Sequence, residues 1–188
     1  MANTLTDFKS ALSGGGARPN LFEVSISPPQ GNSTLFTLDG NFTILCKAAA
    51  LPASNVGNID VPFRGRVFKV AGDRTFDTWQ ITVINDGDFT HRAIFEKWMQ
   101  HIAQYQDASG ASNPNNYMAE ASVKQLKRDA TTSTSNSGGG LSSAKEYKFH
   151  DIFPTNISAI DLSYDSSDQI EEFTVEFQVN HWEPASYS

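Results

Sequence analysis

The stretch PFRGRVFKVAGDRTFDTWQITVIND, residues 62–86, decides the fold because its character changes halfway along. The first half is basic and carries glycines at positions 65 and 72. The second half alternates large apolar residues with small uncharged polar ones, which indicates a strand with one dry face and one wet face. We therefore expect a basic, flexible arm that leads into an amphipathic strand over 76–84. That combination is typical of a part that joins copies of one protein.

The size and composition indicate one folded domain over 1–188. The chain has 39% apolar residues, with 13 Phe and 3 Trp, which is enough to bury a core. No apolar run is long enough to cross a bilayer, and we expect neither a signal peptide nor membrane anchoring. Cys46 is the single cysteine, so an internal disulfide is excluded, which suits a reducing cytoplasm. Its strand-like surroundings predict a buried thiol.

The charge is acidic and unevenly distributed. Lys and Arg number 14 against 21 Asp and Glu, which gives a net charge of −7. Proteins that grip nucleic acid bring an excess of cations to neutralise phosphates, so this balance argues against tight DNA binding. No Lys or Arg follows position 148, whereas residues 151–183 carry eight carboxylates. One end of the chain is therefore acidic, while the arm over 64–74 is basic.

The hydrophobic pattern predicts a mainly β protein with one packed α-helix, in which two antiparallel sheets form a sandwich or a distorted barrel. A helix is expected where apolar residues recur at three- and four-residue spacing, at Ile94, Phe95, Trp98, Ile102 and Tyr105. We expect Asp88 or Thr90 to cap this helix. The flexible parts are an N-terminal segment over 1–19, which holds a short helix at 5–12, and a low-complexity loop over 129–144. Strands are expected over 21–26, 35–38, 42–49, 76–84, 117–129, 146–153, 159–164 and 170–182, with loop over 50–61 and an extended arm over 61–70.

The polar residues show no catalytic or metal-binding signature, and we expect no enzyme activity, metal or cofactor. Asp73, Asp77, Asp86, Asp88 and His91 lie close in sequence, but no pair has a spacing that fixes metal ligands on one face. Roles in turns and helix caps account for them better. The segment DSSDQIE at 165–171 lacks the glycine and the length of a calcium loop, so a turn is expected there.

Several long blocks resemble the tail tube proteins of contractile-tailed, T4-like bacteriophages. Besides residues 62–86, these blocks are ARPNLFEV at 17–24, CKAAALPA at 46–53, AIFEKW at 93–98 and DIFPTNISAIDLSYDSSDQIEEFTVEF at 151–177. They follow the family's order and span nearly the whole chain. The resemblance implies a structural virion protein, assembled in the host cytoplasm, whose six-membered rings stack into a tube with DNA passing through the lumen.

The polar faces of two expected strands are candidates for the wall of this lumen. They carry hydroxyls, amides and a carboxylate but no Lys or Arg, which would hold DNA phosphates. A neutral or acidic wall would let DNA slide. The candidates are Thr78, Gln80, Thr82, Thr174, Glu176 and Gln178.

The arm over 50–75 is the candidate for contact between stacked rings, as the resemblance implies. Apolar burial would supply most of the affinity, whereas charge pairs would set register and orientation. The apolar candidates are Leu51, Val56, Val61 and Phe63; the charged ones are Arg64, Arg66, Lys69 and Arg74, with Glu171 and Glu172 as acidic partners.

Unpaired sheet edges would let copies continue one another's sheets around a ring, and head-to-tail stacking has no built-in limit. Tape-measure and terminator proteins would therefore set the length, while sheath and baseplate would contact the tube. Three alternatives remain open: the tube of a bacterial contractile injection system, a carbohydrate-binding β-sandwich, and a baseplate protein that nucleates the tube and shares its fold. Capsid and terminase genes nearby would distinguish the first, and glycan binding by the monomer would favour the second.

Overall fold

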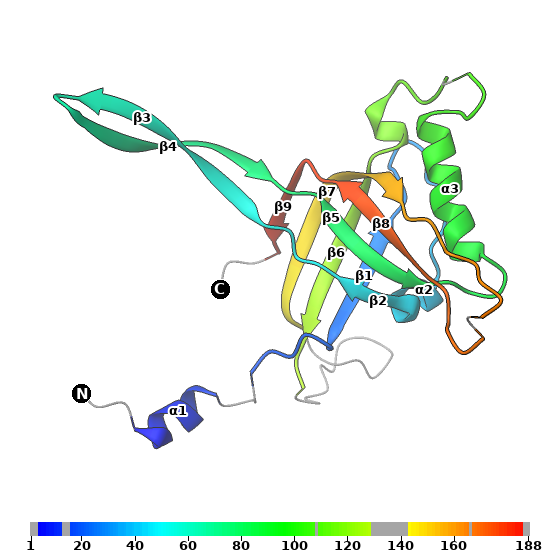
Figure 1. The fold of residues 1–188 in the computed structure, drawn as a ribbon, viewed down its shortest axis with the longest axis horizontal. Helices are drawn as coiled ribbons and strands as arrows, with labels where there is room; N and C mark the ends of the chain where they lie inside the picture. The colour runs from blue at the N-terminus through cyan, green and yellow to red at the C-terminus, as the bar shows by residue number, and fades with distance from the viewer. Residues whose placement is uncertain (1–3, 13–15, 108, 129–142, 166, 186–188) are drawn as a thin grey trace.

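The alternating segments of the sequence pair into one antiparallel seven-stranded sheet and a separate two-stranded hairpin in the computed structural model (Figure 1). The structure describes residues 4–12, 16–107, 109–128, 143–165 and 167–185. The sheet has the order β1-β6-β7-β8-β5-β2, and β9 also pairs with β7. The strands are β1 (Phe22–Ser27), β2 (Cys46–Ala49), β3 (Ser54–Phe63), β4 (Arg66–Phe76), β5 (Trp79–Ile84), β6 (Ala119–Leu126), β7 (Ser143–Ile157), β8 (Glu172–Gln178) and β9 (His181–Pro184).

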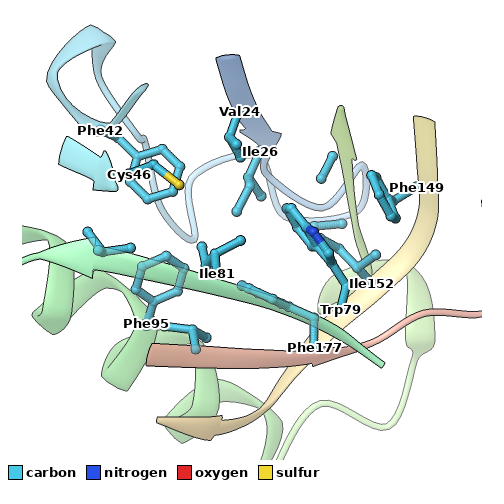
Figure 2. Close-up of a cluster of buried hydrophobic side chains, with 14 of the residues drawn as sticks. Val24, Ile26, Phe42, Cys46, Trp79, Ile81, Phe95, Phe149, Ile152 and Phe177 are labelled. Atoms are coloured by element: carbon cyan, nitrogen blue, oxygen red, sulfur yellow. The ribbon is translucent and has the colours of Figure 1, made fainter. Parts of the chain in front are cut away.

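The sheet has a dry face that is built from alternate residues of its strands. On β5 and β8 the cross-strand partners Trp79 and Phe177 are both fully buried. The ring of Phe149 on β7 stacks on Trp79 with centroids 4.7 Å apart. Figure 2 shows side chains from β1, β5, β7 and β8 pointing into one cluster with Phe95 of the long helix. The alternation expected for β5 and β8 is confirmed, and Cys46 is buried as expected.

A bulge in β7 keeps this cluster continuous along a strand of 15 residues. Asp151 has φ +54°, and two residues of β7 lie opposite the single residue Glu120 of β6. Without the extra residue, Phe149 and Ile152 would face opposite sides of the sheet. With it, both side chains are buried, at 1% and 0% exposure. β7 thus pairs with β6 and β9 along its first part and with β8 along its last part. Apart from the hairpin of β3 and β4, the strands accordingly form one sheet, not the two packed sheets expected from the sequence.

Three α-helices accompany the sheet in the described residues: α1 (Leu5–Ala11), α2 (Gly40–Leu45) and α3 (Thr90–Ile102), with a 3₁₀ turn η1 at Pro114–Asn116. α3 packs on the dry face, where Phe95 meets Phe173 and Phe177 edge-on. The expected helix is therefore confirmed, although Tyr105 lies beyond its end and is exposed. α1 confirms the short N-terminal helix.

Several sequence-based expectations were wrong, each for a local physical reason. Residues 42–45 form the end of α2 rather than a strand, because the Asp39 side chain accepts hydrogen bonds from the first backbone N–H groups of that helix. Residues 54–60 form most of β3 rather than a loop, since β4 pairs with them on both sides of a bulge between Val56 and Asn58. Residues 35–38 and 159–164 form no strand. β7 and β8 pair directly, so 159–164 cannot lie between them as a strand and instead connects them.

Parts of two expected segments lie outside the described residues. They are positions 1–3 and 13–15 of the N-terminal segment over 1–19 and positions 129–142 of the low-complexity loop over 129–144. In the part of the chain that the structure describes, none of the helices has the length and apolarity needed to span a bilayer.

Candidate assembly surfaces

The hairpin of β3 and β4, hereafter the arm, extends away from the sheet (Figure 1). Its strands pair with each other and, in the described residues, with no other strand. Every residue of β3 is exposed, and so are nearly all of β4. Only the base of the arm is anchored, where Phe76 packs edge-on against Trp182 of β9. An isolated two-stranded hairpin is marginally stable in water. The arm therefore receives little support from the rest of the protein.

A two-residue turn closes the arm at its tip. Arg64 has φ +45° and Gly65 has φ +82°, so both central residues occupy the left-handed region. Such turns match the twist of paired strands, and glycine is favoured there because it has no Cβ to clash. The guanidinium of Arg64 lies 5.4 Å from the ring centroid of Phe63, over the ring. The tip therefore presents an aromatic ring and a cation together.

The register of the arm sorts its side chains onto two unlike faces. Val61 lies opposite Phe68, Ile59 opposite Val70 and Phe63 opposite Arg66, and side chains two residues apart share a face. One face is therefore apolar, with Arg66 as its only charged member. The other face begins near the tip with the pair Pro62 and Val67 and continues with Asp60 and Lys69, so it mixes apolar and charged residues. We call the first the apolar arm face; it consists of Ile59, Val61, Phe63, Arg66, Phe68 and Val70.

The predicted stacking residues divide accordingly. Val61 and Phe63 lie on the apolar arm face, Lys69 on the opposite face, and Arg64 in the turn. Val56 and Arg74 lie opposite each other nearer the base, beyond a bulge in the register. Leu51 precedes the arm and is exposed. The four cations thus form no single basic patch, and none makes an ion pair with a described residue of its own subunit.

The two carboxylates expected to receive these cations already have partners. Glu172 Oε1 lies 2.6 Å from Lys47 Nζ. Glu171 Oε2 accepts a hydrogen bond from Asn85 Nδ2 at 3.1 Å. Both carboxylates lie at the start of β8, far from the arm of the same chain (Figure 1). The structure therefore does not bring the predicted charge partners together within one subunit.

The predicted lumen residues do gather on one surface. Gln80 lies opposite Glu176 and Thr82 opposite Thr174, on the face of β5 and β8 that turns away from the core. The two threonine hydroxyls lie 3.5 Å apart. We call this the polar sheet face; Gln178 continues it, while Thr78 lies just before β5 and is exposed. Lys47, which was not among the predicted residues, forms an ion pair with Glu172 at the border of this face.

A buried histidine joins the starts of α2 and α3. His91 is 5% exposed, and its Nε2 lies 3.3 Å from Asp39 Oδ1 while its Nδ1 lies 3.6 Å from Asp86 Oδ1. Phe89 occupies the N-cap position of α3, so the expected cap by Asp88 or Thr90 is wrong. The Asp86 side chain instead accepts hydrogen bonds from the first backbone N–H groups of the helix, those of Thr90 and His91. Burial alone would raise the pKa of Asp86, but hydrogen bonds from Thr90 and His91 outweigh it and lower that pKa.

Two features of these surfaces were missed from the sequence. The first is the rest of the apolar arm face, namely Ile59, Phe68 and Val70. The alternation of apolar residues on both sides of Gly65 could have indicated it. The link from Asp39 to His91 spans residues far apart in the chain, and no pattern in the sequence indicates it. Among the described residues, no three His, Cys, Asp or Glu side chains are placed to hold a metal ion.

Known proteins share both the sequence and the fold of this chain. The family model for phage tail tube proteins matches residues 17–184. The tail tube protein gp19 of Enterobacteria phage T4 is 39% identical over 171 residues, which cover 91% of this chain and 93% of that protein. A chain of the anti-feeding prophage baseplate matches with a TM-score of 0.62 and 10% identity, covering 91% of this chain and 96% of that one. A chain of a contractile injection system's sheath–tube complex matches with a TM-score of 0.58 and 12% identity, covering 95% and 97%.

The fold and its surfaces define a small, mainly β protein with an exposed hairpin arm and a polar sheet face. The sequence match then gives the identity: the chain belongs to the phage tail tube protein family. It is a structural component of a phage tail, which replaces the carbohydrate-binding alternative. The two structural matches at 10% and 12% identity show that the fold is shared with contractile systems.

Proposed function

We propose that this chain forms six-membered rings that stack into the inner tube of a contractile phage tail, and that double-stranded DNA passes through the lumen without specific binding. The observation that carries this is the arm, whose apolar face is left exposed by its own subunit. Exposed apolar patches of this kind mark interaction surfaces. The matching baseplate structure is described as six-fold symmetrised, and the proposal extends that symmetry to this chain.

Within a ring, the outer strands β1 and β2 are the proposed contacts between neighbours. Outer strands present unpaired backbone groups, and pairing with the next copy satisfies them. α2 covers part of the β1 edge, where the Thr43 hydroxyl donates to the Val24 carbonyl at 3.2 Å. The remaining edge groups are available to a second subunit, so that six copies continue one another's sheets around the hole.

The polar sheet face is the proposed wall of the lumen. Gln80, Thr82 and Thr174 offer only neutral groups, and Glu176 adds a negative charge. Lys47, at the border of this face, is paired with Glu172, so it is not available to bind a DNA phosphate. Since retention of DNA scales with the number of phosphates neutralised, such a wall favours passage.

Head-to-tail stacking adds rings without limit, so other proteins must fix the length. The proposed partners are a tape-measure protein and a terminator for length, a baseplate from which the tube starts, and a sheath around its outer surface. The tube of an injection system that delivers a toxin is the alternative. The 39% identity to a phage protein favours the DNA conduit.

Negative-stain electron microscopy of the purified protein tests the assembly. We expect hollow rods or stacked rings with six-fold end views. A protein that stays monomeric at every concentration would contradict the proposal.

The lumen assignment has its own test in the assembled rods. Cysteine at Gln80 is expected to react with a small maleimide but to be shielded from a maleimide on a bulky polymer. Cysteine at Lys97, on the exposed side of α3, is the matched control and should react with both reagents. Equal reaction of both positions with the bulky reagent would place β5 outside the lumen.

A further inference from the structure

The apolar arm face needs a partner surface that its own subunit does not provide. Val61, Phe63 and Phe68 are 43%, 65% and 66% exposed. Near the tip, the Arg64 guanidinium lies over the Phe63 ring and covers part of it. Burying such side chains contributes about 1.5–3 kcal/mol each when burial is complete. A matching acceptor should therefore be apolar within and acidic at its rim, because the tip also carries Arg64 and Arg66.

One groove among the described residues has this character. It lies between residues 159–164 and 169–172, in the connection from β7 to β8, and has a volume of about 630 Å³. Ile160 packs on the core at its base. Leu162 and Ile170 line it and are 79% and 73% exposed, and Tyr164 is fully exposed. These residues form an apolar surface without cover in their own subunit.

The rim of the groove supplies a negative charge that is free to pair. Glu171 and Glu172 line the groove but already bind Asn85 and Lys47. Asp161 also lines it, and its carboxylate has no hydrogen bond or ion pair to any described residue. Asp161 is therefore the carboxylate best placed to receive an arginine from outside the subunit.

The groove and the arm lie at opposite ends of the molecule's long axis (Figure 1). They cannot meet within one chain, yet each has the surface that the other lacks. A contact between two different surfaces is heterologous, so each copy has one arm to offer and one groove to fill. Repeating that contact builds an open stack of copies.

We propose that the groove between residues 159–164 and 169–172 is the acceptor for the arm of a second copy, with Phe63 and Phe68 covering Leu162 and Ile170, and Arg64 pairing with Asp161. This inference rests on the proposed stacking of rings and names the surface on which it occurs. It also replaces Glu171 and Glu172 with Asp161 as the charge partner of the arm.

Disulfide trapping in assembled rods tests the contact. A variant with Arg64→Cys and Asp161→Cys carries one cysteine at the arm tip and one in the groove. Mild oxidation should link copy to copy, and denaturing gels without reductant should show a ladder well beyond the dimer. The native Cys46 does not compete, because burial raises the pKa of its thiol to about 12 and keeps it unreactive.

The matched control pairs Lys69→Cys with Asp161→Cys, since Lys69 lies on the opposite face of the arm. This variant should give no more than background dimer. Rods without a ladder from the first variant, or equal ladders from both, would overturn the acceptor assignment while leaving ring stacking intact. Failure of the unmodified protein to form rods would instead overturn the stacking proposal itself.

A charge exchange provides a second readout that does not depend on cysteine. Arg64→Glu or Asp161→Arg alone should raise the protein concentration needed for rods by about fivefold, as expected for loss of one exposed pair. Combining the two should bring that concentration back to within about twofold of the unmodified protein. Circular dichroism checks that both exposed sites leave the fold unchanged. If the two changes each raised the concentration needed for rods and their effects added in the double variant, the proposed pairing of Arg64 with Asp161 would be contradicted.

Discussion

The sheet and the arm use the same antiparallel pairing, but the sheet buries one of its faces and the arm buries neither. β5 and β8 hold Trp79 and Phe177 at 0% exposure, whereas Phe63 and Phe68 on the arm are exposed. Backbone hydrogen bonds are therefore available to both regions, and apolar burial distinguishes them. Because burial is the dominant favourable contribution to folding, the sheet is stable within one subunit, whereas the arm depends on the proposed contact with a second copy.

The largest effect on subunit stability is expected from Phe177→Ala. Phe177 contacts Trp79, Phe95 and Trp98, so its removal leaves a cavity in the centre of the core. We expect a loss of about 3–5 kcal/mol in the free energy of unfolding. Urea unfolding followed by circular dichroism measures it, at concentrations below those at which rods form. A loss under about 1 kcal/mol would show that the core lies elsewhere.

A smaller effect is expected from Asp86→Asn, which weakens the cap of α3 and its link to His91. We expect a loss of about 1 kcal/mol at neutral pH. Because the pKa of Asp86 is lowered in the fold, its contribution is complete above its ordinary pKa and is lost as pH falls through the lowered value. Melting curves from pH 6 to pH 2 should therefore converge for the two proteins in acid. Asp88→Asn is the matched control, and an equal loss there would contradict the assignment of the cap.

The smallest effect on the subunit is expected from Phe68→Ala, the same change as Phe177→Ala but on the apolar arm face. The free energy of unfolding should change by less than about 0.5 kcal/mol, because the side chain is exposed. Rod formation, followed by sedimentation, should nevertheless be lost or strongly reduced. Normal rods from this variant would show that the arm does not join copies by apolar burial.

The same difference in apolar burial explains which elements could be predicted from the sequence. β5, β8 and α3 were predictable because their burial imposes a strict period of alternate residues or of helical turns. β3 was missed because residues 54–60 bury nothing, so no period marks the strand. Residues 159–164 alternate like a strand but connect β7 and β8, which pair directly with each other.

The assembly surfaces were predicted in part. The polar sheet face followed from alternation, and the arm was located from its charges and glycines. The sequence could not predict which carboxylates lack an ion-pair partner, because the partner of Glu172 is Lys47, 125 positions away in the chain. The apolar arm face could not be predicted in full, because it depends on which residues of β3 and β4 lie opposite each other. The turn at Arg64 and Gly65 fixes that register only when the two strands are paired.

Hydrogen exchange of the backbone amides, compared between dispersed subunits and assembled rods, tests the central claim that a second copy completes the arm. The account predicts that amides of β3 and β4 exchange rapidly in the subunit and become protected in rods, while β5 and β8 are protected in both. An arm that is already protected in the dispersed subunit, or that stays unprotected in rods, would contradict it.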